Sequence, residues 1–158
     1  MALEEDIRVL ERAPVIGEIG HDPLRLLAFS CERRTLSPGD ALFGQGDVSD
    51  GGFVLARGRL VMIDRKSDRE RIVEPIALIG ELAMLTPITR PVSAVARDEV
   101  QVLAISRALF GRVLAEFPGI AMAMRERLLG RLEAEMTALD RVRNTLNGLD
   151  LNRPVRQR

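Results

Sequence analysis

The sequence predicts a mainly β domain whose β region is flanked by helical segments. Between residues 33 and 105, turn-forming residues recur at short intervals and separate apolar runs that are too short for helices. The segments before and after this region are rich in helix-forming residues. A chain of 158 residues suits a single domain with its own core. Short strands at this spacing are typical of a sandwich or a barrel.

The start of the chain predicts short helices with a break between them. Residues 3–11 are rich in helix formers, and Pro14 and Gly17 interrupt that pattern. Asp22 is expected to cap a second helix, with Pro23 at its first position and an apolar run after it. We therefore expect helices over most of the segment that precedes the first strand.

The β region contains about eight candidate strands. Its clearest turn signals are glycine-containing segments at 37–40, 44–47, 49–52 and 58. The apolar runs between the turns are the expected strands, among them Ala41–Phe43, Phe53–Ala56, Arg59–Ile63, Arg71–Val73, Val92–Ala96 and Val100–Ile105.

One segment inside the β region is not strand-like. Residues 80–85 begin with a glycine and continue with good helix formers, and Pro87 ends the run. The backbone N–H groups at the start of a short helix lack helical partners and can bind an anion. The segment therefore predicts a one-turn helix that contributes to an anion site.

Two further helices are expected after the strands. Ser106 is expected to cap a helix over 107–117. A longer helix is expected over about 120–147, and its apolar face contains Leu128, Leu132, Met136, Leu139, Val142 and Leu146. This face suits either packing on the domain itself or pairing with a second copy, and two heptads do not distinguish these. We expect the basic tail 148–158 to be disordered.

Composition excludes several classes of function. Twenty-three basic and 23 acidic residues give no net charge, which argues against a nucleic-acid-binding face. The single cysteine, Cys31, allows no intramolecular disulfide and no cysteine-only metal cluster. The single histidine, His21, is too few for a metal-dependent cupin enzyme. With no signal peptide and no apolar span of about 20 residues, we expect a cytoplasmic protein without membrane insertion. From the single histidine and the single cysteine we expect neither a metal nor enzymatic activity.

The segment 80–95 reads GELAMLTPITRPVSAV and resembles the phosphate-binding cassette of cyclic nucleotide-binding domains. This family includes the catabolite activator protein and the regulatory subunits of cyclic AMP-dependent kinase. The turns at 38–40, 46–47 and 58, and the exit from the last strand at 105–110, match the family as well. The resemblance implies one domain over 1–147, in which helices 1–30 precede an eight-stranded antiparallel jelly-roll barrel over 31–106 and helices over 107–147 follow it.

The resemblance also implies the residues that bind the ligand. In the family, the cassette glutamate binds the ribose 2′-hydroxyl and the arginine binds the phosphate, which gives these roles to Glu81 and Arg90. An arginine fork suits a charged diester with two free oxygens. The remaining expected contacts are Gly80, Leu82, Ala83, Pro91, Val92 and Ser93. The alternative is that Glu81 and Arg90 form an exposed ion pair worth roughly 0–1 kcal/mol.

Two departures from the family pattern affect the ligand. Pro91 has no N–H for the phosphate, and losing that hydrogen bond costs roughly 1–3 kcal/mol of binding. Because some cyclic GMP-preferring relatives use a threonine there, Pro91 slightly favours cyclic AMP. For Ser93, the alternative to a ligand contact is that its hydroxyl is an ordinary polar group of a strand. On the long helix, Glu135 and Thr137 are the candidates for a contact with the base.

The resemblance implies a non-enzymatic sensor that binds cyclic AMP or cyclic GMP. About a dozen residues remain after residue 147, too few for the helix-turn-helix domain of related transcription factors, so we expect a stand-alone sensor. Its C-terminal helix is expected to relay ligand occupancy to an unknown protein partner or, over 120–147, to a second copy in a homodimer. The alternative is a degenerate domain that binds no ligand and serves as a dimerisation or scaffold module.

Overall fold

The computed structural model describes residues 2–119 and, beyond them, residues 122, 123, 125–127, 129, 130, 133, 134, 136, 141 and 144. The chain divides into two compact units, Met1–Met124 and Arg125–Arg158. The described residues from 122 to 144 are helical. The predicted continuous helix over 120–147 lies partly outside the described residues, and the predicted tail 148–158 lies wholly outside them.

Eight strands make up the β region, as the sequence predicts. Helices α1 (Ala2–Arg12), η1 (Ile16–Glu18) and α2 (His21–Ser30) precede them, where η denotes a 3₁₀ helix. The strands are β1 (Glu32–Leu36), β2 (Ala41–Phe43), β3 (Gly51–Arg57), β4 (Leu60–Asp64), β5 (Arg69–Val73), β6 (Ala77–Ile79), β7 (Ser93–Ala96) and β8 (Val100–Ser106). Helix η2 (Glu81–Met84) lies between β6 and β7, and α3 (Arg107–Glu116) follows β8.

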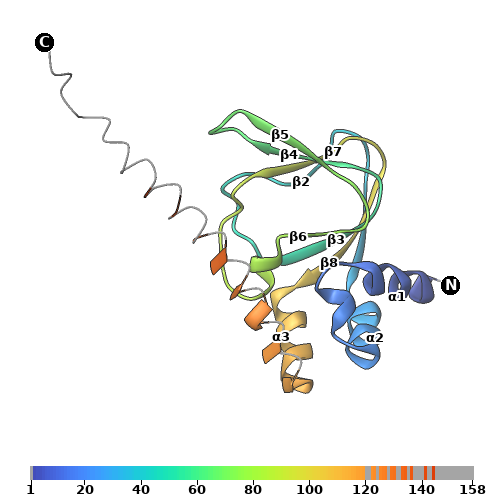
Figure 1. Ribbon diagram of the computed structural model, residues 1–158. Helices are drawn as coiled ribbons and strands as arrows, with labels where there is room; N and C mark the ends of the chain where they lie inside the picture. The colour runs from blue at the N-terminus through green and yellow to red at the C-terminus, as the bar shows by residue number, and fades with distance from the viewer. Residues whose placement is uncertain are drawn as a thin grey trace, which may run out of the picture. The chain divides into compact units, whose positions relative to one another are not determined.

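The strands form two antiparallel four-stranded sheets that face each other (Figure 1). The first sheet has the order β1-β8-β3-β6 and the second the order β2-β7-β4-β5. Among the described residues, no ladder joins the edges β1 and β2 or the edges β5 and β6, so the predicted closed barrel is wrong. The connections at these two edges contain Pro38 and Pro75, and a proline has no N–H with which to extend a ladder.

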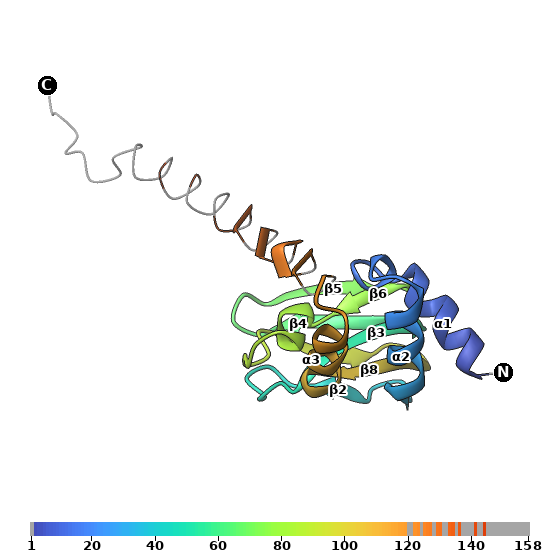
Figure 2. The ribbon, with the colours of Figure 1, turned by 90° about the horizontal axis from the view of Figure 1, so that it is seen from below.

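Two apolar layers hold the fold together. Phe53, Leu55 and Leu60 belong to the layer between the two sheets. On the other side of the first sheet, Val54 and Phe110 belong to a second layer shared with the helices. Helices α2 and α3 therefore cover the face of the first sheet that points away from the second sheet (Figure 2).

The helix starts agree with the sequence in one case and not in the other. The Ser106 hydroxyl accepts a hydrogen bond from the Leu109 N–H at 3.0 Å, which confirms it as the cap of α3. The predicted Asp22 cap is wrong, because α2 begins at His21 after Gly20. Gly20 has a φ of 99°, which glycine adopts readily, and Pro23 is tolerated in the first turn because N–H groups there lack helical partners.

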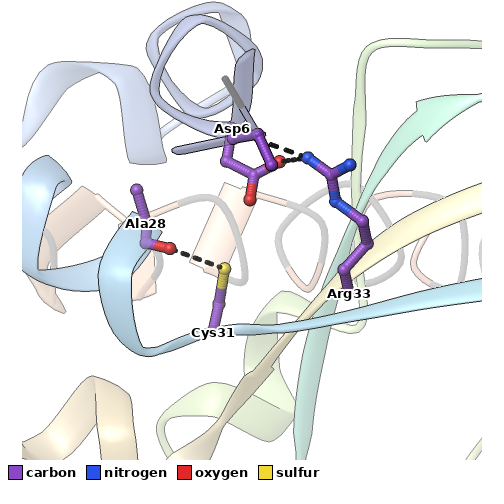
Figure 3. Close-up of polar contacts among 5 residues, drawn as sticks. Asp6, Ala28, Cys31 and Arg33 are labelled. Atoms are coloured by element: carbon purple, nitrogen blue, oxygen red, sulfur yellow. Dashed lines mark hydrogen bonds and ion pairs between the residues drawn. The ribbon is translucent and has the colours of Figure 1, made fainter. Parts of the chain in front are cut away.

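An ion pair and a thiol hydrogen bond lie where the N-terminal helices meet β1 (Figure 3). The Arg33 guanidinium on β1 binds the Asp6 carboxylate of α1 and also donates to the Ala2 carbonyl at 3.2 Å. Cys31, between α2 and β1, donates its thiol to the Ala28 carbonyl at 3.7 Å. Burial and the nearby Asp6 charge raise the pKa of the Cys31 thiol to about 11.

Cys31 is expected to make the stability fall in alkaline solution. Its pKa is about 11 in the folded chain against an ordinary 9.0, so the folded state holds the thiol proton more tightly. The stabilisation is complete below pH 9 and is lost as the pH rises through about 11. Urea unfolding between pH 7 and 10.5 should show this decline, and Cys31→Ala should flatten it. The chain has no tyrosine and a single lysine, so an equal decline in both proteins would contradict the expectation.

Candidate ligand-binding site

The segment between β6 and β7 holds the predicted short helix. Gly80 precedes η2 with a φ of 72°, in the left-handed region that favours glycine. The Leu82 carbonyl accepts hydrogen bonds from the N–H groups of Leu85 at 3.1 Å and Thr86 at 3.0 Å. These bonds close the turn and confirm the one-turn helix that the sequence predicts at 80–85.

Arg90 lies inside the protein rather than on its surface. Its side chain is 4% exposed, and its Nη2 donates to the Gly51 carbonyl at 2.7 Å. Its Cζ lies 4.4 Å from the centre of the Phe43 ring and 5.4 Å from that of Phe53. Both rings belong to the layer between the sheets, so the cation is held by cation–π contacts and one carbonyl. The exposed Glu81–Arg90 ion pair, the alternative that the sequence left open, is not compatible with this burial.

The other terminal nitrogen of Arg90, Nη1, has no hydrogen-bond partner in the described part of the chain. Arg90 Nη1 is buried, and no described residue accepts from it. It lies against Gly80, where an added Cβ would come within 2.5 Å of Nη1. A buried donor without an acceptor is costly, and for a charged group the cost is higher. The arrangement therefore presents an unsatisfied cationic donor directly beside the start of η2.

The charges around Arg90 work in opposite directions. Burial lowers the pKa of Arg90, the charge of Arg107 lowers it further, and Asp50 and Asp47 raise it. The backbone of Arg90 is fixed as well, because its N–H donates to the Asp47 carbonyl and its carbonyl accepts from Gly46, each at 2.8 Å. The site is a fixed buried cation with one further cation and two carboxylates nearby, so the donor that Nη1 offers, and not the net charge, is what suits an anion.

Arg107, at the first position of α3, joins three segments. Its Nε donates to the Ala83 carbonyl of η2 at 3.0 Å, and its Nη2 donates to the Ser49 carbonyl at 2.8 Å. Its backbone N–H donates to the Asp50 carbonyl at 2.6 Å. The start of α3 is thus bonded directly to the short helix and to the loop before β3.

The remaining sequence-predicted residues lie in different places. Gly80, Glu81, Leu82 and Ala83 lie together at η2, and Gly80 lies against Arg90. Val92 lines a cavity on the second sheet. Pro91 is exposed. The buried Ser93 hydroxyl accepts a hydrogen bond from the Gln45 N–H at 2.8 Å and so holds the loop that follows β2. The base-contact candidates Glu135 and Thr137 lie outside the described residues.

The cavity beside Val92 measures about 570 Å³. Its other lining residues come from β4, β5 and the turn between them, and are Met62, Asp64, Ser67, Arg69, Glu70 and Arg71. Hydrogen bonds from Ser67, from the Lys66 backbone and from Gln45 lower the pKa of Asp64, so this carboxylate is held by its own hairpin and by the loop after β2. The cavity is polar on the β5 side and apolar at Met62 and Val92.

Sequence reasoning missed Arg107 and the two aromatic rings. Arg107 follows the helix cap and reads as an ordinary surface residue of a first helical turn. Phe43 and Phe53 read as core residues of two strands, and they are core residues. The one available signal was composition, since Phe43 and Phe53 are two of only five phenylalanines in a chain without tyrosine or tryptophan.

Two four-stranded sheets thus enclose a buried arginine, Arg90, beside the start of the short helix η2. Residues 33–117, more than half of the chain, match the family model of the cyclic nucleotide-binding domain. The chain belongs to the family of cyclic nucleotide-binding domains.

Three relatives show how far the likeness extends. A solved cyclic nucleotide-binding-like protein from Brucella abortus is 34% identical with a TM-score of 0.63, and the match covers 70% of this chain and 98% of that one. The N-terminal domain of a transcriptional regulator from Streptomyces coelicolor A3(2) is 29% identical with a TM-score of 0.72, covering 84% and 94%. Lysophospholipase NTE1 of Phaeosphaeria nodorum is 26% identical over 139 residues, covering 80% of this chain. The match spans only 9% of that relative's length.

Within the part of the chain that the structure describes, no three His, Cys, Asp or Glu side chains are placed to hold a metal ion. None of the helices in that same part is both long and apolar enough to cross a membrane.

Proposed function

We propose that this chain is a non-enzymatic cytoplasmic sensor that binds cyclic AMP or cyclic GMP over a domain of residues 1–147. The observation that carries the proposal is the buried Nη1 of Arg90, which lies against Gly80 and has no acceptor among the residues that the structure describes. A cyclic phosphate diester has one negative charge and free oxygens, which an arginine binds through charge-assisted hydrogen bonds. The anion would supply the acceptor that Nη1 lacks.

Glu81 is assigned to the sugar of the ligand. It opens η2 directly after Gly80, the residue in contact with the Arg90 guanidinium. A carboxylate accepts hydrogen bonds from a ribose 2′-hydroxyl, and a cyclic phosphate leaves that hydroxyl free. Gly80, Leu82 and Ala83 would line the phosphate through their backbone. Pro91 contributes no N–H, so the phosphate depends more heavily on Arg90.

The output of the sensor is assigned to α3 and the segment that follows it. Because Arg107 donates to the Ala83 carbonyl, a shift of η2 on ligand binding would move or break this hydrogen bond and so act on the first residue of α3. An unknown protein partner, or a second copy through 120–147, would read that shift. Equal hydrogen exchange of the α3 amides with and without nucleotide would contradict this relay.

The test of the proposed function is a calorimetric titration of the full chain. We expect saturable binding of at least one cyclic nucleotide with one site per chain. The matching 5′-monophosphates should bind much more weakly, because their dianionic phosphate is attached to the sugar only at the 5′-oxygen, is not closed into a ring at the 3′-oxygen, and does not fit the same cradle. Absence of heat with both cyclic nucleotides, for a chain shown to be folded by circular dichroism, would refute the sensor. That outcome would favour the scaffold or dimerisation module, which Pro91 supports.

A further inference from the structure

The last residue of β2, Phe43, follows an irregularity in the ladder between β2 and β7. Ala41 is paired with Val95 of β7. Phe43, two residues later, is paired with Ala94, which is only one residue away on β7. Two residues of one strand against one of its partner make a β-bulge, and a shift of one residue turns the following side chain to the other face of the sheet. Leu42 and Phe43 accordingly both pack against the layer between the sheets, although they are consecutive.

The bulge places the Phe43 ring on the inner face of the second sheet. Directly paired residues of antiparallel strands share a face. Ala94 is 0% exposed and is also paired with Met62 of β4, which packs in the layer between the sheets. Regular pairing from Ala41 would instead have placed Phe43 opposite Ser93, whose side chain lies on the other face. The irregular register therefore brings the ring to the side of the sheet on which Arg90 is buried.

The guanidinium of Arg90 is restrained more by rings than by hydrogen bonds. The Gly51 carbonyl accepts from Nη2, and a planar group can pivot about a single bond of this kind. The Phe43 ring, with its centre 4.4 Å from Arg90 Cζ, limits that motion. Phe53 supports Phe43, because the two rings are stacked with centres 6.0 Å apart and an angle of 26° between their planes. With the plane held in this way, Nη1 lies against Gly80 at the start of η2.

The segment that begins at Phe43 also fixes the backbone of Arg90. The Gly46 N–H donates to the Arg90 carbonyl, and the Arg90 N–H donates to the Asp47 carbonyl, each at 2.8 Å. Residues 43–47 thus hold the arginine at its backbone and at its guanidinium. One short segment after β2 therefore determines where the cation lies.

We propose that Phe43 is a positioning residue of the phosphate site, an inference that rests on the proposed function. The face of an aromatic ring carries negative charge, so it attracts the guanidinium and holds it flat. A domain in which Nη1 already points to the start of η2 binds the phosphate with its whole population. A domain in which the guanidinium also takes other orientations binds with an apparent affinity reduced by the competent fraction.

The first test is Phe43→Leu, which keeps an apolar side chain and removes the ring. We expect cyclic nucleotide binding to weaken by about 2- to 30-fold, the range that corresponds to the loss of one cation–π contact. Cyclic AMP and cyclic GMP should weaken by the same factor, because the ring acts on the phosphate that both share and not on the base. Calorimetric titration of the full chain measures both factors.

Three further variants distinguish positioning from packing. Phe43→Tyr keeps the ring face and should bind as the wild type does. Pentafluorophenylalanine at position 43 fills nearly the same space and still stacks on Phe53, but the charge on its ring face is reversed. It should weaken binding at least as much as Phe43→Leu. Leu36 of β1 packs against the same layer and has no ring, so Leu36→Ala should lower the urea midpoint and leave the affinity unchanged.

The outcomes separate this inference from the proposed function. Wild-type affinity in Phe43→Leu, or in the pentafluorophenylalanine variant, would overturn the positioning role and leave the sensor intact. A loss of affinity in Leu36→Ala as large as that in Phe43→Leu would assign the effect to packing. If Phe43→Leu does not fold, the comparison of the tyrosine and pentafluorophenylalanine variants decides. Failure of the folded wild type to bind either cyclic nucleotide would refute the sensor itself.

Discussion

Replacing Arg90 by alanine is expected to weaken cyclic nucleotide binding by at least about 100-fold. A hydrogen bond to a charged group contributes roughly 1.5–3 kcal/mol, and the phosphate would lose both the bond from Nη1 and the attraction of the guanidinium charge. Arg90 is also the only cation on the described residues that is nine-tenths buried, so no exposed neighbour replaces it. The measurement is the dissociation constant by calorimetry or by displacement of a fluorescent cyclic nucleotide.

Two further variants make the Arg90 result interpretable. Arg90→Lys keeps the charge but not the planar fork, and it should fall between wild type and Arg90→Ala. Arg97→Ala removes an exposed arginine from the turn between β7 and β8 and should bind as the wild type does. Unchanged affinity in a folded Arg90→Ala variant would show that the phosphate is bound elsewhere.

Replacing Phe110 by alanine is expected to destabilise the domain by roughly 3–5 kcal/mol. Phe110 of α3 is 0% exposed and belongs to the layer between the helices and the first sheet. Truncation leaves a cavity that the rigid strands on one side cannot close. Urea unfolding followed by circular dichroism measures the loss as a lower midpoint with an unchanged slope.

A matched control is available in the same residue type. Phe29 on α2 is 79% exposed, so Phe29→Ala removes little buried area and should change the free energy of unfolding by less than about 0.5 kcal/mol. Similar losses in the two variants would mean that Phe110 does not belong to the structural core.

The sequence predicted the local structure well because its signals are local. Turn glycines at 39, 46 and 58 have positive φ angles, so the strand boundaries between them could be read from residue type. The cap at Ser106 and the one-turn helix at 80–85 were equally visible. The Asp22 cap failed because Gly20, two residues earlier, ends the preceding turn and lets the helix begin sooner.

What the sequence could not supply depends on contacts between distant segments. Whether the sheets close into a barrel is decided at the edges β1 and β2, and β5 and β6, where ladder formation depends on the connecting prolines. Arg90 was found from its motif, but its stacking on Phe43 joins residues 47 positions apart, and no local pattern records this. Arg71 was placed on a strand, while its position opposite Met62 follows from the ladder register.

The incomplete hydrogen bonding of Arg90 has a consequence for the protein as a whole. A cation removed from water with one terminal nitrogen unsatisfied makes the core less stable than an apolar side chain of similar size would. An anion that satisfies this nitrogen removes the deficit, so part of the binding free energy comes from relief of a defect that folding leaves in place. Stability and ligand affinity are thus opposed at this one position. A substitution there that made the empty domain more heat-resistant would make it a poorer sensor.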